Sequence, residues 1–250
     1  MEEWYYYVLL VGVGFVVGFI NTVAGGGSLL SLPVLIFLGL PPNVANGTNR
    51  VAIVIQTATA VAGFKSKGVS TFPFNAYLGI SALFGAIIGA YIAVDINGEL
   101  FNRILAIIMI TVILIILFKP KTTAVHALER TKGKHLWIGI VAFFFFGIYG
   151  GFINAGLGFV MILFLHFVNH MTLVRANATK VAVVFTYMLS ALVVFAINDK
   201  VDWILGLVLA SGNATGAWVA SRYSVKKGDK FIKTFIVVMV AIMAVKLWFF

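Results

Sequence analysis

Two short polar segments stand out because each leads into a long apolar stretch of the chain. The first, ANGTNRVA, covers residues 45–52, and the second, ANATKVA, covers residues 176–182. One gap aligns Arg50 with Lys180. Guanidinium, ammonium, amide and hydroxyl groups all donate hydrogen bonds, so together they favour binding of an anion. The candidate binding residues of these segments are Asn46, Thr48, Asn49, Arg50, Asn177, Thr179 and Lys180.

Glycine-rich segments precede both polar segments: GFINTVAGGGS at residues 18–28 and GFINAGLGF at residues 151–159. Each lies between a long apolar run and a short one, so we expect a helix to end and restart there. The free N–H groups of a restarted helix favour an anion. The alternative is a glycine-capped loop at the membrane surface. The candidate residues are Gly25, Gly26, Gly27, Ser28, Gly156 and Gly158, with Asn21 and Asn154 as amides that either bind an oxyanion or tie two helices together.

A third pair of similar blocks, GAIIGAYIA at residues 85–93 and GNATGAWVA at residues 212–220, completes an internal duplication. Three blocks recur in the same order at an offset of roughly 130 residues, which indicates a repeated architecture. We predict a first transmembrane repeat at residues 1–118, a basic cytoplasmic linker at 119–135 and a second repeat at 136–250.

The chain is too apolar to cover a water-soluble surface. Hydrophobic residues make up 62% of it and charged residues 10%, and the mean hydropathy is +1.07. We therefore expect an all-α integral membrane protein with spans of about 20 residues. Long apolar runs occur at residues 4–22, 43–64, 72–94, 100–118, 136–154, 174–197, 203–221 and 231–250. Shorter runs at residues 28–40 and 157–168 predict half-helices or broken segments, which gives eight to ten transmembrane segments in all.

The cationic residues of the polar segments would be costly inside a membrane. An arginine at a helix centre costs about 2.5 to 3.5 kcal/mol on insertion scales, so Arg50 and Lys180 indicate a water-accessible pocket. The alternative is that they extend to the membrane surface, which is our main interpretation of Arg175. If the pocket exists, Arg50→Ala is expected to abolish saturable anion transport and leave folding intact.

The net charge is +10, and the cationic residues are concentrated in loops between the apolar runs. This distribution indicates that they orient the chain in the membrane, and it argues against nucleic-acid binding. The loops at residues 65–71, 119–135 and 222–233 are basic and are expected in the cytoplasm, whereas those at 95–103 and 198–202 are slightly acidic. Equivalent loops of the two repeats would then face opposite sides, which is typical of inverted-topology repeats in transporters. A parallel repeat with eight full spans and two re-entrant hairpins is the alternative.

Several functions are disfavoured by what the sequence lacks. It has no cysteine, and its acidic residues all lie at the N-terminus, in loops or at span ends. A cation pump or a carboxylate proton relay normally needs an intramembrane acid. We expect no enzyme activity, cofactor or metal site, because no nucleophile and base or metal-ligand cluster appears at a suitable spacing. Small-residue pairs such as Gly14 with Gly18 and Gly147 with Gly151 predict close helix packing.

The segments GGGSLLSLPVL and LPPNVANGTNR, with their degenerate second copies, resemble the TauE/SafE sulfite exporter family, also called toluene sulfonate uptake permeases. The resemblance covers nearly the whole chain. It implies a multi-pass transporter in the plasma (inner) membrane of a bacterium or archaeon that moves small sulfur-containing anions such as sulfite, thiosulfate or organosulfonates (sulfoacetate), often outward. The binding site is expected at the repeat interface, with alternating access.

The chain departs from the family pattern at two positions, because many members carry Asp in place of Asn21 and Lys in place of Arg50. Losing this carboxylate leaves proton coupling open, with bisulfite able to carry a proton itself. Homo-oligomerisation is also left open. The alternatives for function are a passive anion channel and a transporter of another small organic anion, while a non-transporting membrane scaffold would leave the paired polar segments unexplained.

Overall fold

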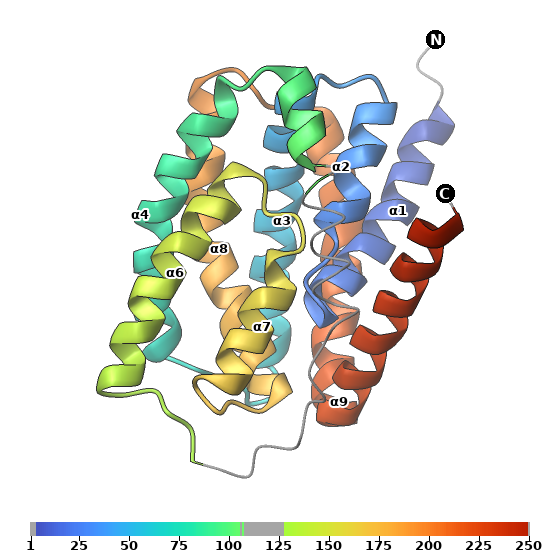
Figure 1. Cartoon of the computed structure of the whole chain (residues 1–250). Helices are drawn as coiled ribbons and strands as arrows, with labels where there is room; N and C mark the ends of the chain where they lie inside the picture. The colour runs from blue at the N-terminus through green and yellow to red at the C-terminus, as the bar shows by residue number, and fades with distance from the viewer. Residues whose placement is uncertain (1–3, 106, 108–127, 250) are drawn as a thin grey trace.

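The computed structural model describes residues 4–105, 107 and 128–249, and all regular elements of this part are helices. Figure 1 shows them as one bundle. The helices are α1 (Trp4–Val23), α2 (Ser28–Phe37), α3 (Pro42–Lys65), α4 (Phe74–Val94), α6 (Lys134–Phe152), α7 (Leu157–Phe167), α8 (Leu173–Ile197) and α9 (Trp203–Phe249). Residues 98–105 are also helical. Most of the predicted 100–118 span and residues 119–127 of the predicted linker lie outside the described residues.

Both predicted helix breaks are present. The chain leaves α1 at Val23 and restarts as the ten-residue α2, and it leaves α6 at Phe152 and restarts as the eleven-residue α7. Gly25 has φ +92° and Gly156 has φ +73°, a region that glycine enters without the steric cost of a Cβ atom. The glycines therefore turn the chain where the two short helices begin.

Five described helices are long and apolar enough to cross a membrane: α1, α4, α6, α8 and residues Trp203–Phe235 of α9. α3 has 24 residues, enough length to span, but its polar first half lowers its hydropathy. Within α9 the backbone bends at Gly228, with φ +71°, between the runs predicted at 203–221 and 231–250. The structure thus confirms an all-α membrane protein, and the total of eight to ten segments stays a prediction.

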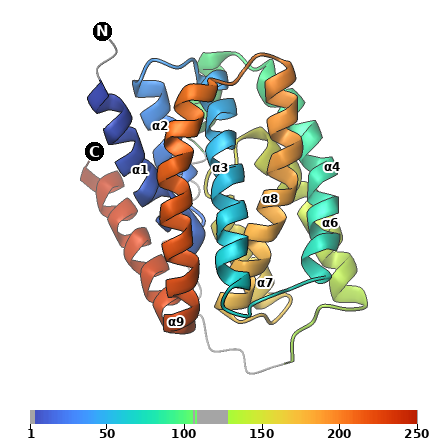
Figure 2. The same ribbon diagram turned by 180° about the vertical axis from the view of Figure 1, so that it is seen from behind.

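The packing of the bundle pairs helices from opposite halves of the chain. α1 packs along α9, α4 packs along α6, and α3 and α8 lie between these pairs, as Figures 1 and 2 show. Glycines line both seams. A Cβ atom added to Gly14 would lie 2.6 Å from the Leu209 carbonyl oxygen, and one added to Gly147 would lie 2.8 Å from Ala82 Cα. The predicted role of these glycines in close helix approach is confirmed.

Replacing Gly147 with alanine is expected to destabilise the protein, because the added methyl group meets the backbone of α4 rather than a movable side chain. Overpacking of this kind costs about 1 to 3 kcal/mol. The measurement is the thermal denaturation midpoint of the detergent-purified protein. Gly12→Ala is the matched control, since nothing lies within 4 Å of its added Cβ. Equal midpoints for both variants would contradict the packing role.

The loops at the two ends of the bundle differ in charge. The connection after α3, the segment before α6 and the bend of α9 lie at the lower end in Figure 2. Lys65 ends α3, Lys67 follows it, and Arg130 and Lys132 precede α6. The short connections from α4 onward and from α8 to α9, which contain Asp95, Asp199 and Asp202, lie at the upper end. Among the described residues, the basic connections thus lie at one end of the bundle and the acidic ones at the other, and the membrane side that each end faces stays a prediction.

Candidate functional site

The two helix breaks meet inside the bundle. Gly25 from the first break and Gly158 from the first turn of α7 are in direct backbone contact. A Cβ atom on Gly25 would lie 2.5 Å from the carbonyl carbon of Gly158, and one on Gly158 would lie 2.8 Å from the carbonyl oxygen of Gly25. Side chains are excluded from this crossing point, so the two short segments approach as closely as backbones can.

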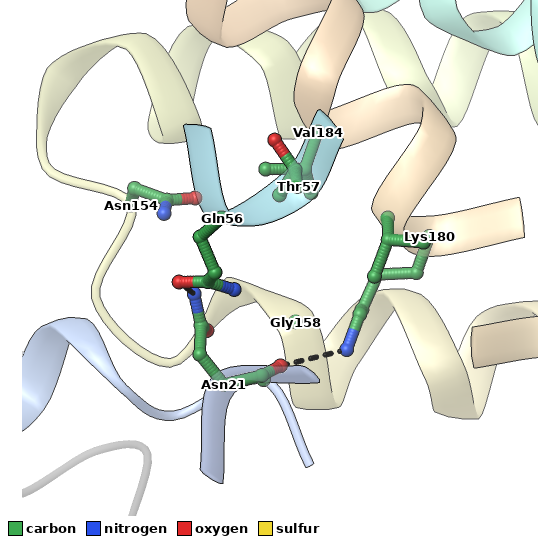
Figure 3. Close-up of a pocket in the computed structure, with 9 residues that line it drawn as sticks. Asn21, Gln56, Thr57, Asn154, Gly158, Lys180 and Val184 are labelled. Atoms are coloured by element: carbon green, nitrogen blue, oxygen red, sulfur yellow. Dashed lines mark hydrogen bonds between the residues drawn. The ribbon is translucent and has the colours of Figure 1, made fainter. Parts of the chain in front are cut away.

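A small cavity lies beside this crossing (Figure 3). It has room for about one water molecule. Five predicted binding residues line it, namely Asn21, Gly25, Asn154, Gly158 and Lys180, together with Gln56, Thr57, Val181 and Val184. Residues from both halves of the chain therefore form one polar chamber surrounded by apolar helices.

Lys180 is the lysine that lines the cavity. Its side chain is 2% exposed, and its Nζ donates hydrogen bonds to the carbonyl oxygens of Asn21 at 2.9 Å and Thr22 at 3.0 Å. These carbonyls belong to the last turn of α1, where unpaired C=O groups carry partial negative charge. Lys180 forms no ion pair with a described residue. Its charge is thus only partly compensated by protein dipoles.

Arg50 occupies the equivalent place in the other half but does not line the cavity. Its guanidinium donates to the carbonyl oxygens of Gly150, Gly151 and Phe152 in the last turn of α6. It also donates to Asn46 Oδ1 at 3.3 Å and lies 4.4 Å from the ring centroid of Phe195. Arg50 therefore fixes the end of α6, and this contact network uses both of its terminal nitrogens.

Two asparagines repeat the same cross-connection. Asn46 Nδ2 donates to the Phe152 carbonyl oxygen at 2.7 Å, and Asn177 Nδ2 donates to the Val23 carbonyl oxygen at 2.8 Å. Each polar segment thus binds the final carbonyl groups of the broken helix from the opposite half. Such groups have no partner within their own helix, and a buried carbonyl without a hydrogen bond is costly.

The matched asparagines of the GFIN segments are held by different partners. Asn21 Nδ2 donates to Gln56 Oε1 at 3.0 Å, and its Oδ1 accepts a hydrogen bond from Gly27 N at 3.3 Å. Asn154 Oδ1 accepts a hydrogen bond from the Tyr187 hydroxyl at 2.6 Å. Both asparagines tie segments of the bundle together and also line the cavity. The helix-tying role is therefore present in the structure, and oxyanion binding stays a prediction.

The remaining predicted residues lie outside the cavity lining. Ser28 Oγ accepts hydrogen bonds at 3.5 Å from Asn49 Nδ2 and Asn154 Nδ2, which joins α2 to α3 and to the second break. Thr48 Oγ1 accepts a hydrogen bond from Asp202 N, and Thr179 Oγ1 donates to the carbonyl of Arg175 one turn earlier. Gly26, Gly27 and Gly156 shape the breaks.

Gln56, Thr57, Val181 and Val184 were missed by the sequence analysis. A helical spacing of four or seven residues from a predicted binding residue could have found three of them, because such residues share a helix face. Gln56 lies seven residues after Asn49, Thr57 lies seven residues after Arg50, and Val184 lies four residues after Lys180. Val181 directly follows Lys180, and this spacing does not select it. No group of three or more His, Asp or Glu residues in the described ranges is arranged to hold a metal.

A small cavity lined by polar and apolar residues and a buried lysine, placed where two helix breaks meet, is typical of a membrane transport protein. Comparison with known proteins identifies the family to which this transport protein belongs. The profile of the family described as sulfite exporter TauE/SafE matches residues 10–247, and the chain belongs to this family.

The relatives are described as membrane transporters. YfcA of Escherichia coli strain K12, named a probable membrane transporter protein, is 31% identical over 244 residues, which cover 96% of this chain and 90% of YfcA. A probable membrane transporter protein of Haemophilus influenzae is 28% identical over 239 residues, covering 96% and 93% of the two chains. No solved structure matches significantly. The protein is therefore a multi-pass membrane transporter of the plasma membrane.

Proposed function

We propose that the protein transports small sulfur-containing oxyanions, such as sulfite, thiosulfate or sulfoacetate, and that it works mainly as an exporter. The observation that carries this proposal is the position of Lys180. It is buried, it lines the cavity at the meeting point of the two helix breaks, and it has no carboxylate partner among the described residues. The family description, sulfite exporter, supports the choice of sulfur anions.

We further infer that the two halves are inverted repeats and that substrate crosses by alternating access. In support, the first helix of each half packs along the last long helix of the other. Each polar segment also binds the end of the opposite broken helix. Both breaks meet at a single backbone contact, so a movement of one half against the other would reshape the cavity first.

The size of the cavity favours a small substrate. Space for about one water molecule does not admit a sulfur oxyanion, so the chamber must widen when substrate enters. The nearby donors are short amide side chains and one ammonium group, which suit compact oxyanions better than a bulky aromatic sulfonate. We therefore place sulfite, thiosulfate and sulfoacetate ahead of larger sulfonates.

The test is efflux from proteoliposomes loaded in turn with sulfite, thiosulfate, sulfoacetate and sulfate. We expect saturable efflux of at least one sulfur anion that accelerates when the same anion is present outside. Flux that rises without saturation and shows no such acceleration would identify a passive anion channel instead. Absence of flux for all four anions would contradict the proposal and favour another small organic anion.

A further inference from the structure

Lys180 and Arg50 occupy equivalent positions but differ in one chemical respect. A lysine ammonium can lose its proton inside a protein, whereas an arginine guanidinium stays charged. The half that carries the arginine uses it to bind three carbonyl groups at the end of α6. The half that carries the lysine places it against the cavity. The cation that faces substrate is thus the one that can exchange a proton.

The hydrogen bonds of Lys180 match the donors of a neutral amine. Asn21 and Thr22 supply two carbonyl acceptors, at 2.9 and 3.0 Å, and a neutral amine has two N–H groups. The third position on Nζ is a lone pair in the neutral form and an N–H group in the protonated form. Neither form leaves these carbonyls unpaired, and only the protonated form offers an additional donor to a ligand.

Among the described residues, no other buried side chain around Lys180 is free for this exchange. In the described part of the chain, the buried charged or titratable side chains are Arg50 on α3, His166 on α7, and Lys180 and Tyr187 on α8. Arg50 binds the end of α6, the Tyr187 hydroxyl donates to Asn154, and His166 Nδ1 lies 2.8 Å from the Met171 carbonyl oxygen. The half-buried Tyr149 on α6 donates to the Ala155 carbonyl oxygen. The described buried parts of α1, α2, α4 and α9 add no charged side chain.

We propose that Lys180 carries a proton across the membrane together with each anion, an inference that rests on the proposed function. When an anion enters, the neutral amine takes up one proton from water on that side, and the new N–H group donates to the anion. On the other side the anion and the proton leave, and the amine is restored. Because a buried charge without a counter-ion is unfavourable, anion and proton binding stabilise each other.

The experiment follows proton and anion movement together in proteoliposomes that contain a pH-sensitive dye. Thiosulfate and sulfoacetate are the probes, because both are fully deprotonated near neutral pH and so carry no proton of their own, unlike sulfite. For the wild type, we expect proton movement in the same direction as the anion. Lys180→Arg keeps the charge but cannot exchange the proton, so we expect the number of protons moved per anion to fall at least tenfold in the anion flux that this variant retains. If the variant shows no anion flux, the measurement in detergent solution described below decides. Lys132→Arg, at an exposed lysine, is the matched control and should behave as the wild type.

Three results would overturn the proposal in distinguishable ways. Wild-type flux of either anion without proton movement would exclude proton coupling but leave the proposed function intact. Unchanged proton movement in Lys180→Arg would assign the proton to another group. Absence of any wild-type flux would contradict the proposed function and this proposal with it. Should Lys180→Arg not fold, wild-type protein in unbuffered detergent solution decides the matter: addition of thiosulfate should raise the pH, and no change would refute proton uptake.

Discussion

Replacing Lys180 with methionine is expected to lower the transport efficiency for sulfur anions by about a hundredfold. The variant loses the charge-assisted hydrogen bond to the anion, which contributes about 3 kcal/mol at the upper end of the usual range. Methionine is also unbranched and flexible, so it can fill the space of the lysine stem beside Val181 and Val184. The measurement is the saturation curve of anion efflux from proteoliposomes.

The control for this variant is Lys132→Met, which makes the same substitution at an exposed lysine before α6. We expect it to leave the saturation curve unchanged. Lys180→Met is also expected to be less stable than the wild type, because the carbonyls of Asn21 and Thr22 lose the partner they have in the structure. Efflux is therefore compared only for detergent-purified protein that elutes as a single species. Normal saturable efflux by the folded Lys180→Met variant would remove Lys180 from the substrate site.

Replacing Arg50 with alanine is expected to destabilise the folded protein by about 3 kcal/mol or more. The arginine is 1% exposed, and its loss leaves the buried carbonyls of Gly150 and Gly151 without the partner they have in the structure. Each unsatisfied buried acceptor costs about 1 to 3 kcal/mol. The variant also loses the contact with the Phe195 ring and leaves a cavity. The sequence alone predicted intact folding for this variant, and the carbonyl contacts argue against that expectation.

Thermal denaturation in detergent measures the effect, and Arg50→Lys is the informative companion. A lysine keeps a cation near the end of α6 but supplies fewer donors than the guanidinium, so its denaturation midpoint should lie between those of wild type and Arg50→Ala. An unchanged denaturation midpoint for Arg50→Ala would contradict the structural role of Arg50. If this variant lost transport but kept its stability, Arg50 would be assigned to substrate binding, as the sequence predicted.

Much of the fold follows directly from the pattern of apolar runs and glycines. The short helices were predicted at residues 28–40 and 157–168 and are found at Ser28–Phe37 and Leu157–Phe167. This agreement has a local cause: glycine, proline and the length of an apolar run act on their own stretch of chain. The candidate span at 43–64 forms a helix that is long enough to cross a membrane. Because its first half is polar, its mean hydropathy is lower than that of the five apolar candidate spans.

The site was less predictable because its geometry depends on contacts between distant segments. Alignment of the two polar segments places Arg50 and Lys180 at equivalent positions. The residues of either segment alone do not predict which of the two side chains lines a cavity. That difference arises from partners in the opposite half, such as Asn21 for Lys180 and Gly150 for Arg50. Tyr187 and Gln56, which hold the two matched asparagines, also differ in size and chemistry.

The contact between Gly25 and Gly158 restricts which sequences the two glycine-rich segments can adopt. A side chain gained at either position meets the backbone of the other segment, which cannot move aside as a flexible side chain could. The double variant Gly25→Ala with Gly158→Ala should therefore be at least as impaired as either single one. The polar segments, in contrast, carry Arg50 and Lys180 at aligned positions, each with its own set of partners. Sequence differences between the two halves are thus tolerated where side chains find partners and excluded where the two backbones cross.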